Sequence, residues 1–210
     1  MALISPTWYR QGHGYWFPYL GQDRSPFWLS MDESATGRLV QAVTDDDGEI
    51  FLRFPVGYGV GTWAEVATGI TGERPCVRYA RRKGDGAIVL TYEDVGGAIK
   101  RQTTINEGGT WSVATTIAAA GKFPATALLP GGEGATADAW WVTGGAIKFR
   151  TFDAFGSAVT AEVTAVAAAG AAEDAIGLVA RKDGSFALSY RNGSGAIVNI
   201  TSTDGGQTWA

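Results

Sequence analysis

The chain has 210 residues with 30 glycines, 8 tryptophans, one cysteine and one histidine, and 45% of its residues are hydrophobic. Its 17 basic and 21 acidic side chains give a formal net charge of −4. This composition suits one globular domain and excludes a disulfide scaffold and a four-ligand zinc site, because the sequence offers only Cys76 and His13. The scattered charges predict no nucleic-acid partner.

Membrane, secretion and cofactor signals are missing from the sequence. No run of about 20 apolar residues occurs, so we expect no membrane insertion. The N-terminus lacks the basic start and long apolar centre of a secretory signal, which predicts synthesis in a host cytoplasm. Without a P-loop, a dinucleotide fingerprint or metal-ligand spacing, we expect no cofactor and no metal.

In chain order, residues 1–14 hold one apolar and aromatic run, LISPTWYR, of suitable length for a β-strand. The segments that follow are similar to one another: 15–70, 71–123, 124–172 and 173–210. Each begins with an apolar run, turns at glycine and aspartate, and continues with the two-residue alternation of a strand. Four short antiparallel strands per repeat of about 50 residues is the pattern of a propeller blade.

Four glycines align these repeats: Gly37, Gly97, Gly145 and Gly195. They are 60, 48 and 50 residues apart, so the first repeat contains about 12 additional residues. We assign these to the glycine-rich stretch FPVGYGVGTWAEV, which carries Tyr58 and Trp63. The stretch is either a functional loop or a lengthened hairpin.

The third and fourth repeats each raise a question about the fold. The stretch AEVTAVAAAGAAEDA in the third repeat favours a helix by propensity, but its place in the repeat predicts a strand and a loop. The fourth repeat stops at Ala210, with no room for a fourth strand. We predict that residues 1–14 complete this last blade and remove an exposed edge, within one chain or between subunits. The predicted fold is therefore an all-β propeller of about four four-stranded blades.

A turn motif recurs in the repeats. The fourth repeat contains the complete motif, Ser-Thr-Asp-Gly-Gly-Gln-Thr-Trp, in which Ser202, Asp204, Gly206 and Trp209 are the defining residues. The counterparts are Thr104, Asn106, Gly108 and Trp111 in the second repeat, and Thr44, Asp46 and Gly48 in the first. The third repeat has Ala154 and Val159 at the acidic and aromatic positions. In such a turn the carbonyl side chain accepts backbone hydrogen bonds, glycine supplies a positive φ, and tryptophan covers the hairpin. We prefer this interpretation of residues 45–49 to a calcium loop, because they lack the distal glutamate of an EF-hand.

The motif S-x-D-x-G-x-T-W resembles the Asp box of the sialidase-like, BNR-repeat propellers. That resemblance implies a propeller fold and a structural role for the boxes, away from any catalytic centre. A sialidase-like hydrolase also needs an arginine cluster and a tyrosine paired with a glutamate. Tyr92 and Glu93 are adjacent on a predicted strand and so face opposite ways, and Arg53-Phe54-Pro55 follows a box where the family's Arg-Ile-Pro precedes one. We therefore predict no catalytic residues, with a compact sialidase-like glycosidase as the alternative.

Aromatic residues provide candidate binding sites. Tyr58, Trp63, Trp140 and Trp141 could stack on sugar rings or pack in a protein interface. Neighbours on a strand face opposite ways, so we expect one ring of the Trp140–Trp141 pair in the core and the other outside or against a neighbouring blade. Small propellers with boxes and no secretion signal resemble bacteriophage tail and spike modules. The resemblance implies a non-enzymatic virion protein that binds a host-surface glycan, other virion proteins or its own copies.

Overall fold

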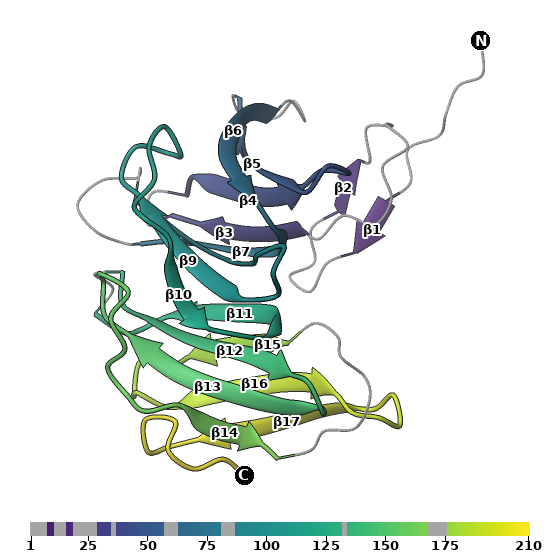
Figure 1. The fold of residues 1–210 in the computed structure, drawn as a ribbon, viewed down its shortest axis with the longest axis vertical. Helices are drawn as coiled ribbons and strands as arrows, with labels where there is room; N and C mark the ends of the chain where they lie inside the picture. The colour runs from purple at the N-terminus through teal and green to yellow at the C-terminus, as the bar shows by residue number, and fades with distance from the viewer. Residues whose placement is uncertain are drawn as a thin grey trace.

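The fold is seen in a computed structural model that describes residues 8–10, 16–18, 29–34, 37–56, 63–80, 87–131, 134–167 and 176–210. These residues form strands and turns, with no helix among them (Figure 1). None of the described segments is therefore a helix long and apolar enough to cross a membrane. The expectation of an all-β protein is confirmed.

Fifteen of the strands form four antiparallel sheets, which we number 1 to 4. In each sheet the strands follow chain order. Sheet 1 contains β3 (Leu29–Glu33), β4 (Leu39–Thr44), β5 (Glu49–Pro55) and β6 (Trp63–Thr71); sheet 2 contains β7 (Glu73–Tyr79), β8 (Ile88–Glu93), β9 (Ile99–Thr104) and β10 (Thr115–Ala118); sheet 3 contains β11 (Lys122–Leu128), β12 (Thr136–Val142), β13 (Ala146–Phe152) and β14 (Val163–Val166); and sheet 4 contains β15 (Gly177–Ala180), β16 (Phe186–Arg191) and β17 (Ile197–Ser202). Strand β14 confirms the strand expected in the alanine-rich stretch, of which residues 168–175 lie outside the described part of the chain.

The sheets succeed one another like propeller blades. Their first strands lie side by side, β3 beside β7, β7 beside β11 and β11 beside β15. No comparable contact joins β15 back to β3 among the described strands, and Figure 1 shows sheet 1 and sheet 4 at opposite ends of the molecule. The described sheets therefore form an open series of blades.

The completion of the last blade by residues 1–14 is not confirmed. Strand β1 (Trp8–Arg10) pairs with β2 (Trp16–Pro18), and Figure 1 shows this hairpin at the end of the molecule that holds sheet 1. The place beside β17 is occupied at one point by Ala210, which exchanges backbone hydrogen bonds of 2.8 and 3.0 Å with Thr201. Residues 1–7 and 11–14 lie outside the described part of the chain.

The turn between the second and third strands is the same in all four sheets. Its glycines are Gly48, Gly97, Gly145 and Gly195, with φ of 79°, 77°, 81° and 83°. Each donates its N–H to the carbonyl three residues earlier, at 2.8–3.1 Å, and the left-handed φ favours glycine there. These glycines are 49, 48 and 50 residues apart.

The structure thereby corrects the alignment of the first repeat. Gly37 lies between β3 and β4, the first and second strands, so it is not equivalent to Gly97. The 60-residue spacing between Gly37 and Gly97 therefore compared a turn between the first and second strands with a turn between the second and third strands. Strands β5 and β6 pair directly, with Pro55 opposite Trp63, as in a lengthened hairpin whose residues 57–62 lie outside the described part of the chain.

The core lies between consecutive sheets. We call the side of each sheet that is directed toward the next sheet its forward face. Counted from the turn glycines, its residues are Val40, Ala42, Ile50 and Leu52 in sheet 1; Val89, Thr91, Ile99 and Arg101 in sheet 2; Ala137, Ala139, Ile147 and Phe149 in sheet 3; and Ala187, Ser189, Ile197 and Asn199 in sheet 4. In sheets 1 to 3 all of these side chains are at most 1% exposed. The backward faces of sheets 2 to 4 are also buried, at Val77, Ile88 and Leu90; Thr126, Thr136 and Asp138; and Leu178, Phe186 and Leu188.

Candidate functional site

The interface between sheets 2 and 3 is polar where the other two interfaces are apolar. Thr91 and Arg101 occupy forward positions of sheet 2 that hold Ala42 and Leu52 in sheet 1. On the facing side, Thr126, Thr136 and Asp138 replace the valine, isoleucine, leucine and phenylalanine side chains found in sheets 2 and 4. We call Thr91, Arg101, Thr126, Thr136 and Asp138 the polar seam.

Asp138 lies at the centre of the polar seam and is fully buried. Its carboxylate accepts hydrogen bonds from the hydroxyls of Thr126 at 2.5 Å, Thr136 at 2.7 Å and Thr91 at 3.5 Å. Burial raises the pKa of Asp138 above its ordinary value, although these hydroxyls and the charge of Arg101 act in the opposite direction. Because the carboxyl exposes no surface, it cannot meet a substrate in this structure.

Arg101 connects the two sheets at one end of the polar seam. It is 1% exposed and donates hydrogen bonds to the carbonyls of Gly134 at 2.7 Å and Asp153 at 3.0 Å, both in turns of sheet 3. Burial lowers the pKa of Arg101, while the charges of Asp138 and Asp153 oppose that change. A guanidinium keeps its charge in proteins, so it compensates the buried carboxyl.

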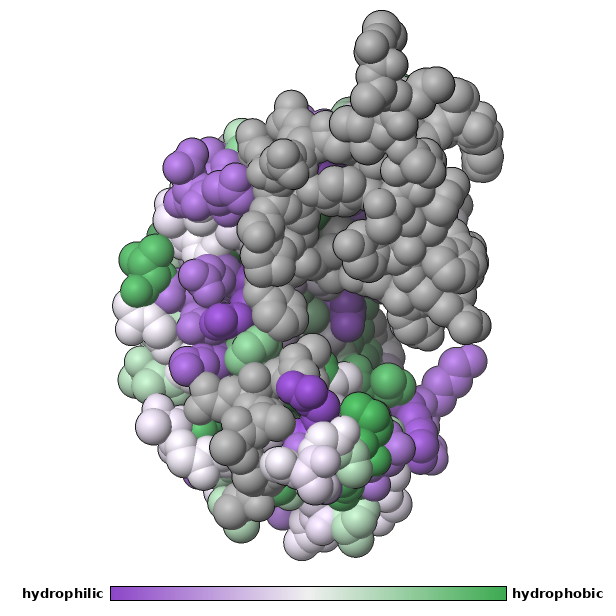
Figure 2. All heavy atoms as spheres, turned by 90° about the vertical axis from the view of Figure 1, so that its right-hand side faces the viewer, coloured by the Kyte–Doolittle hydropathy of each residue, from purple (hydrophilic) through white to green (hydrophobic). Residues whose placement is uncertain are grey.

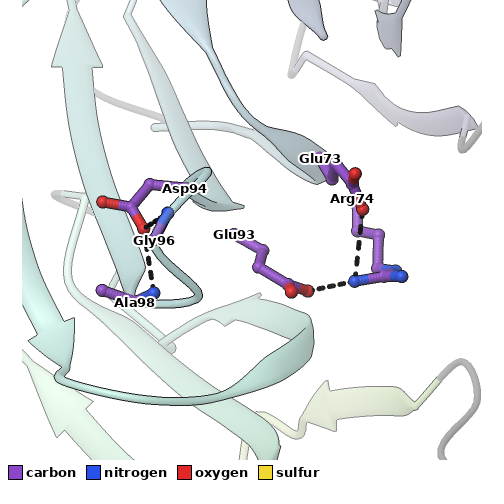
Figure 3. Close-up of polar contacts among 6 residues, drawn as sticks. All are labelled: Glu73, Arg74, Glu93, Asp94, Gly96 and Ala98. Carbon is purple, nitrogen blue, oxygen red and sulfur yellow. Dashed lines mark hydrogen bonds and ion pairs between the residues drawn. The ribbon is translucent and has the colours of Figure 1, made fainter.

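A second polar group lies where the same interface opens at the other end of the strands. Arg74, at the start of β7, forms an ion pair with Glu93, at the end of β8 (Figure 3). The Arg74 guanidinium also lies 4.3 Å from the ring centroid of Phe123, at the start of β11. The Arg74 and Glu93 side chains are 21% and 10% exposed, so solvent reaches them. We call Arg74, Glu93 and Phe123 the Arg74 cluster.

The backbone places Arg74 and Phe123 in equivalent positions of sheets 2 and 3. Each precedes a proline, and each has a φ of 51°, in the left-handed region that non-glycine residues rarely adopt. Backbone strain of this kind is found at ligand sites more often than elsewhere. Register shifts in β7 and β11 begin at the residues just before, Glu73 and Lys122.

Tyr92 and Glu93 do not form the pair that a sialidase-like mechanism needs. The Tyr92 hydroxyl donates to Gln102 at 2.7 Å, on the side of sheet 1, while Glu93 turns toward Arg74. Burial, with a smaller contribution from the Asp94 charge, raises the pKa of Tyr92 to about 12. Asp94 binds the N–H groups of Gly96 and Ala98 at 2.9 Å (Figure 3). The expectation that Tyr92 and Glu93 face opposite ways is confirmed.

The box-like turns of sheets 2 and 4 share one hydrogen-bond pattern. Asn106 accepts from the hydroxyl of Thr104 at 2.8 Å and the N–H of Thr110 at 2.9 Å. In sheet 4, Asp204 accepts from Ser202 at 2.8 Å and from the N–H of Thr208 at 2.9 Å, and hydrogen bonds led by that of the Thr208 hydroxyl lower its pKa.

These turns pack against the preceding sheet. A Cβ on Gly108 would lie 3.1 Å from Leu52 of sheet 1, and one on Gly206 would collide with the Phe149 ring of sheet 3. Trp111 packs on the core between sheets 1 and 2, while the Trp209 ring lies edge-on, 5.1 Å from Phe149. The turns are therefore wedges between blades.

The assignment of Thr44, Asp46 and Gly48 to the same motif is wrong. They lie in the turn between the second and third strands of sheet 1, whereas Thr104 and Ser202 end third strands. Asp45, not Asp46, accepts the turn hydrogen bonds, from the N–H groups of Asp47 at 3.1 Å and Glu49 at 2.8 Å.

The aromatic candidates for ligand binding differ in their exposure to solvent. Trp140 and Trp141 are both fully buried, so the prediction that they contact a ligand is wrong for this structure. Sheet 3 is covered on both faces, and the two rings pack against sheet 2 and sheet 4 respectively. Trp63 begins β6 and is partly exposed, and Tyr58 lies outside the described residues.

A shallow groove of about 460 Å³ lies between sheets 3 and 4, at the strand ends opposite to the Arg74 cluster. Polar residues that line it include Thr151, Lys182 and Asp183. Its one aromatic ring, Phe186, is 3% exposed, so the groove offers no ring face for stacking. The Arg74 cluster combines charge with a partly exposed ring and is the stronger candidate.

Sequence reasoning missed the residues that form the polar seam and the Arg74 cluster. The signal for the polar seam is Arg101, Thr126 and Asp138 at repeat positions that are apolar elsewhere, which becomes visible once Gly48 anchors the first repeat. The signal for the cluster is the recurrence of Gly-Glu-Arg-Pro as Gly-Lys-Phe-Pro at residues 72–75 and 121–124.

Solved structures show the same type of fold. AofleA from Arthrobotrys oligospora superposes with a TM-score of 0.66 at 13% identity, over 97% of this chain and 62% of that one. The fucose-specific lectin from Aleuria aurantia gives 0.60 at 13% identity, over 88% and 59%, and the Bacteroides ovatus xyloglucan PUL protein GH43B gives 0.62 at 13%, over 87% and 40%. The chain thus spans less than two thirds of these proteins. No family model matches it, and no curated protein matches its sequence.

The neighbours include fucose-binding lectins of the propeller type, and at these identities the similarity establishes the fold alone. The described part of this chain is accordingly an all-β protein of four blade-like antiparallel sheets, with a propeller-type lectin fold.

Proposed function

We propose that this protein is a non-enzymatic carbohydrate-binding module and that the Arg74 cluster is its sugar site. The observation that carries the proposal is the placement of a guanidinium, a carboxylate and a phenyl ring together where two sheets of a lectin-like fold open to solvent.

The chemistry of the cluster matches the two surfaces of a sugar. Hydroxyl groups at the ring edge accept hydrogen bonds from a guanidinium fork and donate them to a carboxylate. The C–H face of the ring stacks on an aromatic side chain. Arg74 and Glu93 supply the polar groups and Phe123 the ring, and the hydrogen bonds of Arg101 in the polar seam link sheets 2 and 3 beneath them.

A binding role is favoured over hydrolysis by the arrangement of the carboxylates. Glu93 forms an ion pair with Arg74, and Asp94 forms an ion pair of 2.5 Å with Lys100 and accepts hydrogen bonds from N–H groups of its turn. Asp138 is fully buried. A glycosidase needs two carboxyl groups flanking the scissile bond, or the tyrosine–glutamate nucleophile of a sialidase. A compact sialidase-like hydrolase stays the alternative function, and a phage virion as the site of action stays a prediction from the sequence.

A glycan array followed by calorimetry tests the proposal. We expect the wild type to bind α-methyl fucoside or another sugar of the array without turnover, and Arg74→Met and Phe123→Ala each to weaken binding at least about tenfold, the loss of one good polar or stacking contact. Arg53→Met, which removes an exposed ion pair with Glu65 in sheet 1, is the matched control and should bind normally.

Two results would count against the proposal. One is sugar binding that survives both cluster variants. The other is release of the fluorophore from a fluorogenic sialoside, which would show the hydrolase instead.

A further inference from the structure

The Arg74 cluster belongs to a molecule whose surface is mixed. Figure 2 shows apolar and polar surface alternating in small patches on one side of the molecule. Arg74 and Phe123 are both partly exposed, and ordering such side chains costs conformational entropy. Apart from their direct contact, their relative position therefore depends on contacts inside the molecule.

Side chains of the first strands link neighbouring sheets. Ser30 on β3 accepts a hydrogen bond from the N–H of Val77 on β7 at 3.0 Å. The Cys76 thiol on β7 accepts one from the N–H of Thr126 on β11 at 3.3 Å. Ser30, Cys76 and Ala125 occupy the same position of their strands, since their partners in the second strands are equivalent residues: Ala42, Thr91 and Ala139. Because Ala125 has no side-chain acceptor, this type of link cannot form between β11 and β15.

The link made by Cys76 lies close to the Arg74 cluster along both strands. Cys76 follows Arg74 by two residues on β7, and Thr126 follows Phe123 by three residues on β11. Cys76 is 7% exposed and Thr126 is completely buried. Water therefore does not replace the thiol as the partner of the Thr126 N–H, and a buried N–H without an acceptor is costly.

A second link fixes the other end of the segment that carries Phe123. Gly121 donates its N–H to the carbonyl of Gly97, in the turn between β8 and β9 of sheet 2, at 2.9 Å. Between the two links the register of β11 against β12 shifts, from Lys122 to Ala125, and Phe123 has its φ of 51°. The position of the ring thus depends on the two links to sheet 2, together with its contact with the apolar core between sheets 3 and 4.

We propose that Cys76 is a positioning residue, whose thiol holds the Phe123 ring against the Arg74 guanidinium. By accepting the Thr126 N–H, the thiol fixes the start of β11 relative to β7, the strand that carries Arg74. Without this acceptor the start of β11 shifts to find another partner for the N–H, and the ring moves with it. The role of Cys76 in sugar binding rests on the function proposed above, whereas its role in placing the ring does not.

NMR spectroscopy tests the placement of the ring without any sugar. In the wild type, nuclear Overhauser effects should join the Phe123 ring to the Arg74 side chain, because the guanidinium lies 4.3 Å from the ring centroid. Cys76→Ala should lose them, whereas Cys76→Ser, which supplies a hydroxyl acceptor like that of Ser30, should keep them. Alanine is the native residue at the equivalent position of sheet 3, so we expect Cys76→Ala to fold. Cys76→Val, which also lacks an acceptor but fills the space of the thiol, should behave like Cys76→Ala.

Calorimetry on the same variants tests the effect on the site, with α-methyl fucoside or the array sugar that the wild type binds. Cys76→Ala should weaken binding about three- to tenfold, the effect of one lost hydrogen bond, and Cys76→Ser should stay within about twofold of the wild type. Ser30→Ala is the matched control, because it removes the equivalent link between sheets 1 and 2 and should bind sugar normally.

The outcomes separate the two proposals. Overhauser effects that persist in Cys76→Ala and Cys76→Val, or a sugar affinity that falls as much in Ser30→Ala as in Cys76→Ala, would overturn the positioning role. A wild type that binds no sugar would overturn the proposed function alone, because the Overhauser effects measure the position of the ring directly.

Discussion

The interface between sheets 2 and 3 differs in chemistry from the two interfaces that flank it. Sheets 1 and 2, like sheets 3 and 4, meet through continuous apolar clusters. Sheets 2 and 3 share a smaller apolar cluster around Trp140 and, beside it, the buried Arg101, Asp138 and three threonines. The same strand geometry therefore accepts either kind of packing, and most of the buried polar atoms of this interface have partners, Arg101 Nε being an exception.

The turns at the ends of the third strands explain how the polar interface is closed. In sheets 2 and 4 a tryptophan wedge, Trp111 or Trp209, packs on the sheet before it. Sheet 3 has Val159 at this position, 65% exposed, and Arg101 of sheet 2 instead donates to the carbonyl of Asp153 in the same turn. A cation with two carbonyl acceptors thus takes the place of an indole ring.

The largest effect should come from breaking an apolar interface. Phe149→Ala empties a position that is 1% exposed and removes ring contacts to Phe186 and Trp209. We expect the free energy of unfolding to fall by about 3–5 kcal/mol, as for other buried phenylalanines, measured by urea denaturation. Phe155→Ala, at a ring that is 81% exposed, is the control. A loss in Phe149→Ala no larger than in this control would contradict the wedge model.

Breaking the polar interface should cost somewhat less and depend on pH. Arg101→Leu leaves the Asp138 carboxyl buried without its compensating cation, which should lower the free energy of unfolding by about 3 kcal/mol at neutral pH. The measurement is urea denaturation at several pH values.

The sign of the pH dependence follows from Asp138. Burial raises its folded pKa above the unfolded value of about 4. Its contribution to stability is present below the unfolded pKa and is lost as the pH rises through the folded pKa. Without Arg101 the folded pKa rises further, so the deficit of Arg101→Leu should grow with increasing pH. Adding Asp138→Asn should remove that trend, and its persistence would show that another group titrates.

The smallest loss of stability should come from changing the box-like turns. Asn106→Ala removes hydrogen bonds to Thr104 and Thr110 and should lower the free energy of unfolding by about 1 kcal/mol, seen as a drop in melting temperature. Ile105→Ala, beside it and 84% exposed, should change stability by less than about 0.5 kcal/mol. Equal effects of the two variants would mean that the Asn106 network contributes nothing.

Much of the fold could be predicted from local patterns. Strand alternation and the turn glycines Gly97, Gly145 and Gly195 define most hairpins, because each depends on residues near in sequence. The first repeat was misaligned because Gly37 also ends a hairpin with a positive φ, so two unlike turns look the same in the sequence.

The candidate site was harder to predict. Polar residues on a strand normally indicate a solvated face, so Arg101 and Asp138 gave no sign that they face each other across two sheets. Alternation correctly placed Trp140 and Trp141 on opposite faces of their strand, but both are buried because sheet 3 has a neighbour on each face, which depends on the tertiary arrangement.

The open arrangement of the sheets has a consequence for local unfolding. Among the described sheets, sheet 4 has three strands and packs on sheet 3 alone, whereas sheets 2 and 3 are each held from two sides. In a molecule whose units touch only adjacent units, the terminal unit opens before the central ones. Backbone amides of β15 to β17 should then exchange with deuterium sooner than those of β8 and β12, and the region that loosens first is the one that leaves Ile197 open to water.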